Sequence, residues 1–498
     1  MLGLKHRVRQ RGIAALLLVI TLLLGAAAVF YGLSTATPPE IERDRKTAEA
    51  LQLAKSALLA YAVSVNINGA AGTTRLGDLP CPDNNNSGVA NTAGCGNAAG
   101  TTGQTSRLGR LPWKDLGLSD LRDGDGERLW YAVSNNFKRA TRTTCNATSP
   151  ATCLNSDTRG TITIRDSFGN TIHNATNTDP ATSGVVAVIF SPGAILRRLA
   201  GAQQDRSCGS DATCIATNVC GSTATPKCNP VNYLDTNGTE DNADFSDISA
   251  APSVNGFING IVRDAGGNVI VNDRLTVITY QNLMPKLEKR VVAEVANCLK
   301  AYASTNNARY PWAAPVSDVT TPFSDLVNTT FGRIPDNPFV QTPFGTSAPT
   351  SALTTACNAE PNKCMAPIWP STCLLPLSPS GNSWWNNWKL HVFYGVADAY
   401  KPMISFTQPT PSTVLLSGIT PTGGCPSCLT VEPGTTANKL FVVVLASKQL
   451  SAAQPRSTTA NKQNPSNYLE NENNNGDAVF TRLTSGTTFN DIVISSPP

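Results

Sequence analysis

An uncharged apolar run from Ile13 to Leu33 constrains this 498-residue chain more than any other feature. A helix over these positions, at ~1.5 Å rise per residue, spans the ~30 Å hydrocarbon core of a bilayer. Four basic residues precede the run and favour a cytoplasmic N-terminus: Lys5, Arg7, Arg9 and Arg11. The sequence therefore predicts a transmembrane helix over residues 13–33, with the rest of the chain on the far side of the membrane.

A charged, amphipathic segment follows Pro38 and Pro39. Its apolar positions recur every three or four residues, which predicts one buried helical stripe: Ala48, Leu51, Ala54, Leu58, Ala62 and Val65. We expect a continuous helix from Ile13 to Asn66, unless the two prolines bend or end it, since proline removes a backbone donor.

The junction Arg11-Gly12-Ile13, which stands before the apolar run, resembles the class III leader of type IV pilins and type II secretion pseudopilins. The resemblance implies cleavage between Gly12 and Ile13 by a prepilin peptidase and methylation of the new N-terminus. Leu17 occupies the fifth mature position, where most pilins carry glutamate, and this departure is similar to the minor pseudopilin at the fibre tip. Two alternatives stay open: an uncleaved anchor, or a secretory signal cut at residues 26–28.

The chain holds two copies of one unit, because five landmarks recur in the same order. These are a helix ending in Ala-Tyr, an aromatic strand, an apolar run, an Asn-Tyr-Leu triplet before an acidic segment, and a closing strand. They stand at 54–66, 127–134, 185–191, 232–234 and 272–279, and again at 295–307, 389–397, 441–447, 467–469 and 490–496. Neither apolar run alternates, so each should be a central strand covered on both faces.

These features predict an α+β fold. A long N-terminal helix, transmembrane and then amphipathic, packs on an antiparallel sheet, and a second tandem helix-plus-antiparallel-sheet head follows. The resemblance to pilins implies the same arrangement for each head. The predicted parts are a leader at 1–12, a transmembrane segment at 13–33, a first pilin-like head at 34–282 and a second at 283–498.

Charge and cysteine content restrict the partners and the compartment. Charged residues make up 15% of the chain, below the usual ~25%, and the formal net charge of +4 matches the four basic residues of the leader. The near-neutral remainder argues against a nucleic-acid partner. All 14 cysteines follow the apolar run, and an even number in an exported chain indicates disulfides.

Close spacing nominates most of the disulfide pairs, although connectivity cannot be deduced from sequence. The nominated pairs are Cys81–Cys95, Cys145–Cys153, Cys208–Cys214, Cys220–Cys228, Cys357–Cys364 and Cys425–Cys428. Cys298 and Cys373 are left as a long-range pair.

The chain offers little for catalysis, and we predict that it is not an enzyme. His6 lies in the leader, His173 in a loop and His391 in a predicted strand. The sequence has no nucleophile elbow, zinc-protease motif or phosphate-binding loop. Cys425 and Cys428 have the spacing of a redox pair, but a local structural disulfide is the favoured interpretation.

Acidic loops are candidate calcium sites, because calcium prefers clustered carboxylate and carbonyl oxygens on tight turns. The candidate ligands are Asp120, Asp123, Asp125 and Glu127 in one loop and Asp235, Asn237 and Asp241 in another. The counterpart of the second loop in copy two holds Glu470, Glu472, Asn474 and Asp477. Pseudopilin heads often hold calcium near their C-terminal strands, so the resemblance implies calcium there; solvated turns are the alternative.

Three tryptophans precede a predicted strand in a polar setting: Trp384, Trp385 and Trp388. Either they form a contact surface for sugar or protein, or they pack against the sheet or the first head, and packing is favoured.

The resemblance implies a minor pilin-like or pseudopilin-like structural subunit of a type IV pilus or type II secretion fibre, located at the tip and acting in assembly and contact. Its expected partners are other pilin or pseudopilin subunits, a prepilin peptidase and the inner membrane. The chain would cross the inner membrane once, with its heads in the periplasm or on the cell surface. The alternative is an inner-membrane-anchored envelope binding protein or adhesin outside any fibre.

Overall fold

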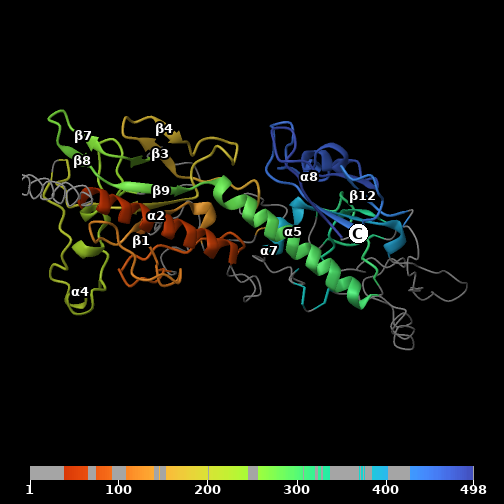
Figure 1. Ribbon diagram of the computed structural model, residues 1–498, viewed down its shortest axis with the longest axis horizontal. Helices are drawn as coiled ribbons and strands as arrows, with labels where there is room; N and C mark the ends of the chain where they lie inside the picture. Colours follow the sequence, from red (N-terminus) through yellow and green to blue (C-terminus); the bar gives the residue numbers. More distant parts are fainter. Residues whose placement is uncertain are drawn as a thin grey trace, which may run out of the picture.

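Two long helices, each lying on a four-stranded sheet, organise the molecule from end to end (Figure 1). The computed structural model describes residues 39–64, 75–91, 108–138, 145, 153–199, 201–244, 256–306, 308–319, 323–326, 329–336, 369–370, 372–373, 375, 384–401, 425 and 427–496. The two helix-and-sheet units follow one another along the longest axis, with the N-terminal unit at one end (Figure 1).

The first unit places α2 (Pro39–Ser64) on an antiparallel sheet with the order β1-β2-β5-β9. The strands are β1 (Leu108–Arg110), β2 (Trp130–Val133), β5 (Ala187–Ser191) and β9 (Arg274–Ile278). The helix is rich in strong helix formers, and its small and apolar residues face the sheet. β5 is buried throughout, so the apolar run forms an interior strand covered on both faces.

The second unit repeats this arrangement with α5 (Tyr280–Thr305) on an antiparallel sheet of order β10-β11-β13-β15. Its strands are β10 (Phe331–Arg333), β11 (Val392–Val396), β13 (Phe441–Leu445) and β15 (Ile492–Ser495). A capping box between Thr279 and Asn282 satisfies the first backbone donors of α5. β13 is also fully buried and central, like β5 in the first unit.

Smaller sheets and short helices cover the two units. The strands are β3 (Thr163–Asp166), β4 (Thr171–His173), β6 (Gly256–Asn259), β7 (Val262–Arg263), β8 (Val269–Val271), β12 (Thr430–Glu432) and β14 (Val479–Thr481). The short helices are α4 (Ala212–Thr217), α7 (Trp384–Trp388) and α8 (Thr459–Lys462). β6 pairs with β3, and β14 with β12, in parallel.

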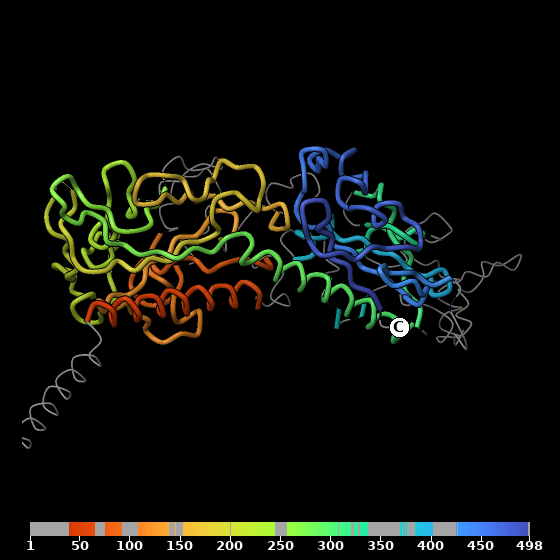
Figure 2. Tube along the Cα trace, turned by 45° about the horizontal axis from the view of Figure 1, so that its top comes forward, coloured from red at the N-terminus to blue at the C-terminus, as the bar shows by residue number. Residues whose placement is uncertain are grey.

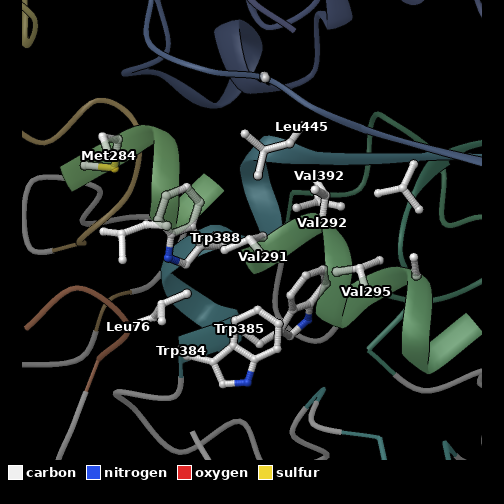
Figure 3. Packing of buried hydrophobic residues seen from close by; sticks show 14 of the residues in the cluster. Leu76, Met284, Val291, Val292, Val295, Trp384, Trp385, Trp388, Val392 and Leu445 are labelled. Atoms are coloured by element: carbon white, nitrogen blue, oxygen red, sulfur yellow. The ribbon is translucent and has the colours of Figure 1, made fainter. Parts of the chain in front are cut away.

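One hydrophobic core runs through both units, and α5 is the element that they share. Figure 2 shows α5 leaving the first unit and continuing along the second. In Figure 3 the tryptophans of α7 lie beside Val291, Val292 and Val295 of α5, and all of these residues are buried. Leu58 of α2 belongs to the same cluster, as does Val443 of β13. The largest cluster is therefore shared by the two units, and a separate cluster in the first unit contains Trp130, Val188 and Phe257.

The predicted fold class, α+β with a long N-terminal transmembrane helix on purely antiparallel sheets, is wrong. The described chain is a mixed α/β structure with several small sheets, two of which contain parallel pairs. The first described helix begins at Pro39, and it carries charged residues along its first half, including Glu42, Arg45 and Glu49. The predicted helix from Ile13 to Asn66 is therefore described only from Pro39 to Ser64.

The predicted localisation, a single-pass inner-membrane protein, is also wrong for the part of the chain that the structure describes. None of the helices formed by the described residues is long and apolar enough to cross a membrane. The predicted span at residues 13–33 and the processing residues Gly12 and Ile13 lie outside the described residues.

Replacing Leu58 with alanine should destabilise the protein by ~2–5 kcal/mol, because its side chain is fully buried in the shared core. Leu53→Ala is the matched control on the same helix, since Leu53 is 49% exposed and its loss should cost less than ~0.5 kcal/mol. Urea unfolding of both variants measures the difference. Equal midpoints for the two would contradict the packing of α2 on the first sheet.

Candidate functional site

The guanidinium groups of two arginines in the first unit, Arg110 and Arg206, lie over the ring of Tyr233. The Arg110 guanidinium carbon lies 4.0 Å from the Tyr233 ring centroid and 4.4 Å from that of Trp130, and that of Arg206 lies 4.7 Å from the Tyr233 ring. Arg110 Nη2 donates to the carbonyl oxygen of Lys227 at 3.1 Å. Burial lowers the pKa of Arg110 and raises that of Tyr233. Cation–π contacts and carbonyl acceptors thus replace water around a buried charge.

The second unit has the same construction around Tyr468. The guanidinium carbons of Arg333 and Arg456 lie 4.8 Å and 4.7 Å from its ring, and Arg333 Nη2 donates to the Lys462 carbonyl oxygen at 3.0 Å. Burial lowers the pKa of Arg333 to about 10. The shared contacts define four equivalent pairs: Arg110 and Arg333, Arg206 and Arg456, Lys227 and Lys462, and Tyr233 and Tyr468.

A buried acidic group follows each tyrosine. In the first unit the Asp235 backbone N–H donates to Asp273 Oδ2 at 2.8 Å, and Asn242 Nδ2 donates to the same oxygen at 2.9 Å. Burial raises the pKa of Asp235 to about 6, and burial together with the nearby Asp235 charge raises the pKa of Asp273 well above its ordinary value. Asp273 Oδ1 has no hydrogen-bond partner in the described part of the chain. These properties favour a protonated Asp273.

The second unit repeats this acidic group with Glu470, Asp491 and Asn473. Glu470 N–H and Asn473 Nδ2 both donate to Asp491 Oδ2, at 3.0 Å and 2.9 Å. Asn473 Oδ1 accepts from Thr481 N–H, as Asn242 Oδ1 accepts from Ile258 N–H. The structure therefore equates β14 with β6, and Phe480 with Phe257.

At the junction of the units, the first unit supplies a carboxylate to the second. Asp157 Oδ1 lies 3.0 Å from Arg456 Nη1, and its Oδ2 lies 3.6 Å from His391 Nε2. Burial raises the pKa of Asp157, but Arg456 and His391 outweigh this effect and leave its pKa below the ordinary value. Burial lowers the pKa of His391 to about 4, so at neutral pH Arg456 is the cation that Asp157 meets.

Arg206, the equivalent of Arg456 in the first unit, lines a cavity of about 160 Å³ at the other end of the molecule. We call it the basic end cavity and define it by Arg110, Arg122, Arg128, Arg206, Lys227 and Glu127, which line it. Asn218, the C-cap residue of α4, also lines it. Figure 1 shows α4 at the end of the molecule away from the second unit, so the cavity that Asn218 lines lies at that end.

Basic groups outnumber acidic ones in the basic end cavity. Asp120 pairs with both Arg122 and Arg128, each at 2.7 Å, and Glu127 pairs with Arg206 at 3.3 Å. Lys227, which also lines the cavity, has no ion pair with any described residue. An excess of positive charge remains, which favours an anionic ligand. We treat this cavity as the candidate site.

The first predicted calcium loop lies next to this cavity, and its carboxylates have protein partners. Asp120 pairs with arginines, Asp125 lies 3.4 Å from Arg43, and Glu127 meets Arg206. Asp123 is buried and accepts from Ser191 Oγ at 2.7 Å, which fastens the loop to β5.

The side chains of the second predicted calcium loop also have protein partners. Gln204 donates to Asp235, Asn237 Oδ1 accepts from the Glu240 backbone N–H, and Arg198 pairs with Asp241. Within the described residues, no group of three or more His, Cys, Asp or Glu side chains could hold a metal ion. The calcium sites stay predictions that these contacts do not favour.

The predicted contact tryptophans are buried rather than presented to solvent. Trp384, Trp385 and Trp388 are at most 2% exposed, and Trp385 Nε1 donates to Asp336 at 2.7 Å. Packing, the favoured interpretation, is what the structure shows. His391 is also buried, with its Nδ1 3.1 Å from the Ala446 carbonyl oxygen.

Disulfides are present, as an exported chain with an even number of cysteines predicted. The bridges that the structure describes join Cys145–Cys153, Cys208–Cys214, Cys220–Cys228, Cys298–Cys373 and Cys425–Cys428. Each is a pair nominated from the sequence. Cys81 is disulfide-bonded as well, while Cys95, Cys357 and Cys364 lie outside the described residues. The Cys425–Cys428 spacing closes a local loop.

Sequence reasoning missed the residues of the candidate site, although a signal was present. Residues 108–112, LGRLP, recur as residues 331–335, FGRIP, and each copy contains the arginine that stacks on the tyrosine. Glycine is needed in both: a Cβ at Gly332 would lie 1.9 Å from the Ala314 carbonyl oxygen, and one at Gly109 2.7 Å from that of Asp83.

Comparisons with known proteins add no family or relative. No protein-family profile, no curated protein and no solved structure matches this chain.

Asp273→Asn should stabilise the protein by about 1–2 kcal/mol at pH 8 and change it little at pH 4. An acid whose folded pKa is raised binds more protons folded than unfolded between the two pKa values, so its contribution to stability falls as pH rises through that interval. The side-chain oxygen of asparagine can still accept the two hydrogen bonds that Asp273 Oδ2 accepts. Because asparagine does not ionise, the loss of stability with rising pH should disappear. Unfolding free energies across this pH range measure it, and Asp491→Asn should behave alike. An unchanged pH profile would contradict it.

Asp157→Asn should destabilise the protein by about 1–3 kcal/mol at pH 7, because the Arg456 side chain is only 6% exposed and would keep its charge without a partner. The folded pKa of Asp157 is lowered, so its stabilisation is present above the unfolded value of ~3.9 and is lost as pH falls below that value. The control is Asp179→Asn. Asp179 pairs with Lys448 across the same junction at 3.0 Å, but its side chain is 43% exposed. Its replacement should therefore lower the unfolding free energy by less than ~1 kcal/mol. Equal losses would refute the role of Asp157.

Proposed function

We propose that this chain is a minor structural subunit of a type IV pilin-like fibre, in which it acts by assembly and contact. The observation that carries the proposal is the packing of two copies of one helix-on-sheet unit within a single chain. The copies share α5 and one core, and they meet through Asp157 and Arg456. A chain that already contains one contact between units is suited to making further contacts of the same kind.

The sequence before the described residues supports the fibre assignment. Arg11-Gly12-Ile13 resembles the leader that a prepilin peptidase recognises, and Leu17 stands where shaft subunits carry glutamate. We therefore propose processing after Gly12 and a place near the fibre tip. Other pilin-like or pseudopilin-like subunits and the peptidase are the expected partners.

The second candidate is a binding protein outside any fibre. The basic end cavity favours it, because a site with an excess of positive charge suits an acidic ligand whether or not the chain polymerises. The two candidates differ in what happens to the N-terminus, since only the fibre subunit requires the leader to be removed.

N-terminal sequencing of the mature protein should give Ile13 with a methylated amine. Gly12→Val should block this processing, because a branched side chain replaces the residue at the cleaved bond, and it should prevent recovery of the chain in purified fibres. Ala28→Val is the control for a conventional leader and should leave the N-terminus at Ile13. A mature protein that begins at Met1, or at a residue near position 29, would refute the fibre proposal.

A further inference from the structure

We propose that the basic end cavity binds a side-chain carboxylate of a partner protein that packs against the open end of the first unit, as Asp157 of the first unit binds Arg456 of the second. This inference adds the chemistry of a contact to the assembly role. It rests on the geometry of the two units, and only the identity of the partner depends on the proposed function.

The two units provide the template, because equivalent arginines have different surroundings. Arg456 Nη1 donates to the Ser447 carbonyl oxygen at 2.8 Å and to Asp157 of the preceding unit at 3.0 Å. Arg206 Nη1 donates to the Gly193 carbonyl oxygen at 2.9 Å and meets Glu127 of its own unit at 3.3 Å. The second unit therefore takes its acidic partner from a neighbour. Among the described residues, Arg206 has no such acidic partner from outside its own unit.

Unused donors line the cavity around this arginine. Arg110 is 3% exposed, its Nη atoms donate to two carbonyl oxygens, and its Nε has no partner among the described residues. The Arg333 Nε lacks a described partner as well, so this feature belongs to the repeated stacking and does not by itself indicate a ligand. Lys227 and Arg122 are the decisive groups. Lys227 has no ion pair with a described residue, and Arg122, which pairs with Asp120, still has a side chain that is 45% exposed at the cavity.

Glu127 partly neutralises the positive charge of the basic end cavity when no partner is present. Its carboxylate, 27% exposed, lies against Arg206 and neutralises part of the excess charge. An incoming carboxylate must therefore compete with Glu127 for the same guanidinium or bind beside it on Lys227 and Arg122. Like charges repel, so Glu127 weakens binding, and its removal should have the opposite effect to removal of a basic residue.

The size of the cavity fits this ligand. About 160 Å³ accommodates a carboxylate and the carbons that carry it, but not a folded segment. The rest of a protein partner would lie over the mouth of the cavity, where loops 83–88 and 120–128 and the disulfide-linked segment that carries α4 meet. The Cys208–Cys214 and Cys220–Cys228 bridges hold that segment in place.

The experiment titrates the full chain with an acetylated peptide of residues 154–160, which carries the carboxylate of Asp157, and with the same peptide containing asparagine at that position. Saturation-transfer NMR at low salt should show saturable binding of the aspartate peptide, with a Kd of about 1 mM, and about tenfold weaker binding of the asparagine peptide. Lys227→Gln and Arg122→Gln should each weaken binding about fivefold, and Glu127→Gln should strengthen it. Lys289→Gln, an exposed change on α5, should have no effect.

Several results would overturn the proposal. These are no difference between the two peptides, no effect of Lys227→Gln and Arg122→Gln in protein with an unchanged thermal midpoint, or binding of succinate and phosphate without preference for the aspartate peptide. The last result would make the cavity a small-anion site. Because the titration does not depend on leader processing, its failure and the failure of the fibre proposal are separate outcomes.

Discussion

Burial of α5 between the two units is the interaction on which the rest of the structure depends. Leu283 and Leu287 near its start, and Leu299 and Tyr302 near its end, are all buried in the shared core, where α5 packs against α2 of the first unit and β13 and β15 of the second. Each apolar side chain buried in this way contributes ~1.5–3 kcal/mol. Separation of the units would expose one half of the helix, so the units stabilise each other through one element.

Each unit also holds the same buried polar group, in which two arginines stack on a tyrosine and a carboxyl pair lies behind it. Burying such a group is costly unless most of its donors and acceptors find partners, so these partners cannot change independently. That constraint explains why the two copies retain the same hydrogen bonds while the loops around them differ. It also gives the molecule a direction, because the second unit's arginine faces the first unit and the first unit's arginine faces the open end.

Local features of the fold could be predicted from the sequence, and long-range ones could not. The apolar runs ending at Ser191 and Ser447 predicted the interior strands β5 and β13, because an unbroken apolar run requires cover on both faces. Close cysteine spacing predicted local bridges, because short loops bring few alternatives together. The fold class was wrong because the parallel pairs β3-β6 and β12-β14 join distant segments whose order in space no local pattern encodes. The acidic loops suggested calcium because sequence shows carboxylates but not the arginines that reach them.

Hydrophobic periodicity and cysteine spacing act over a few residues, so the local pattern of the chain was enough to predict the interior strands, the amphipathic helices and the short-range disulfides. The partners of the charged groups, in contrast, follow from the packing of segments that are distant in the chain. Asp157 and Arg456 are separated by 299 positions, and the tryptophans of α7 pack beside α5 although about 80 residues separate the two helices in the chain. The physical reason is that a charge is stabilised by whichever opposite charge and donors folding places within about 4 Å, and this depends on how two sheets and a shared helix pack.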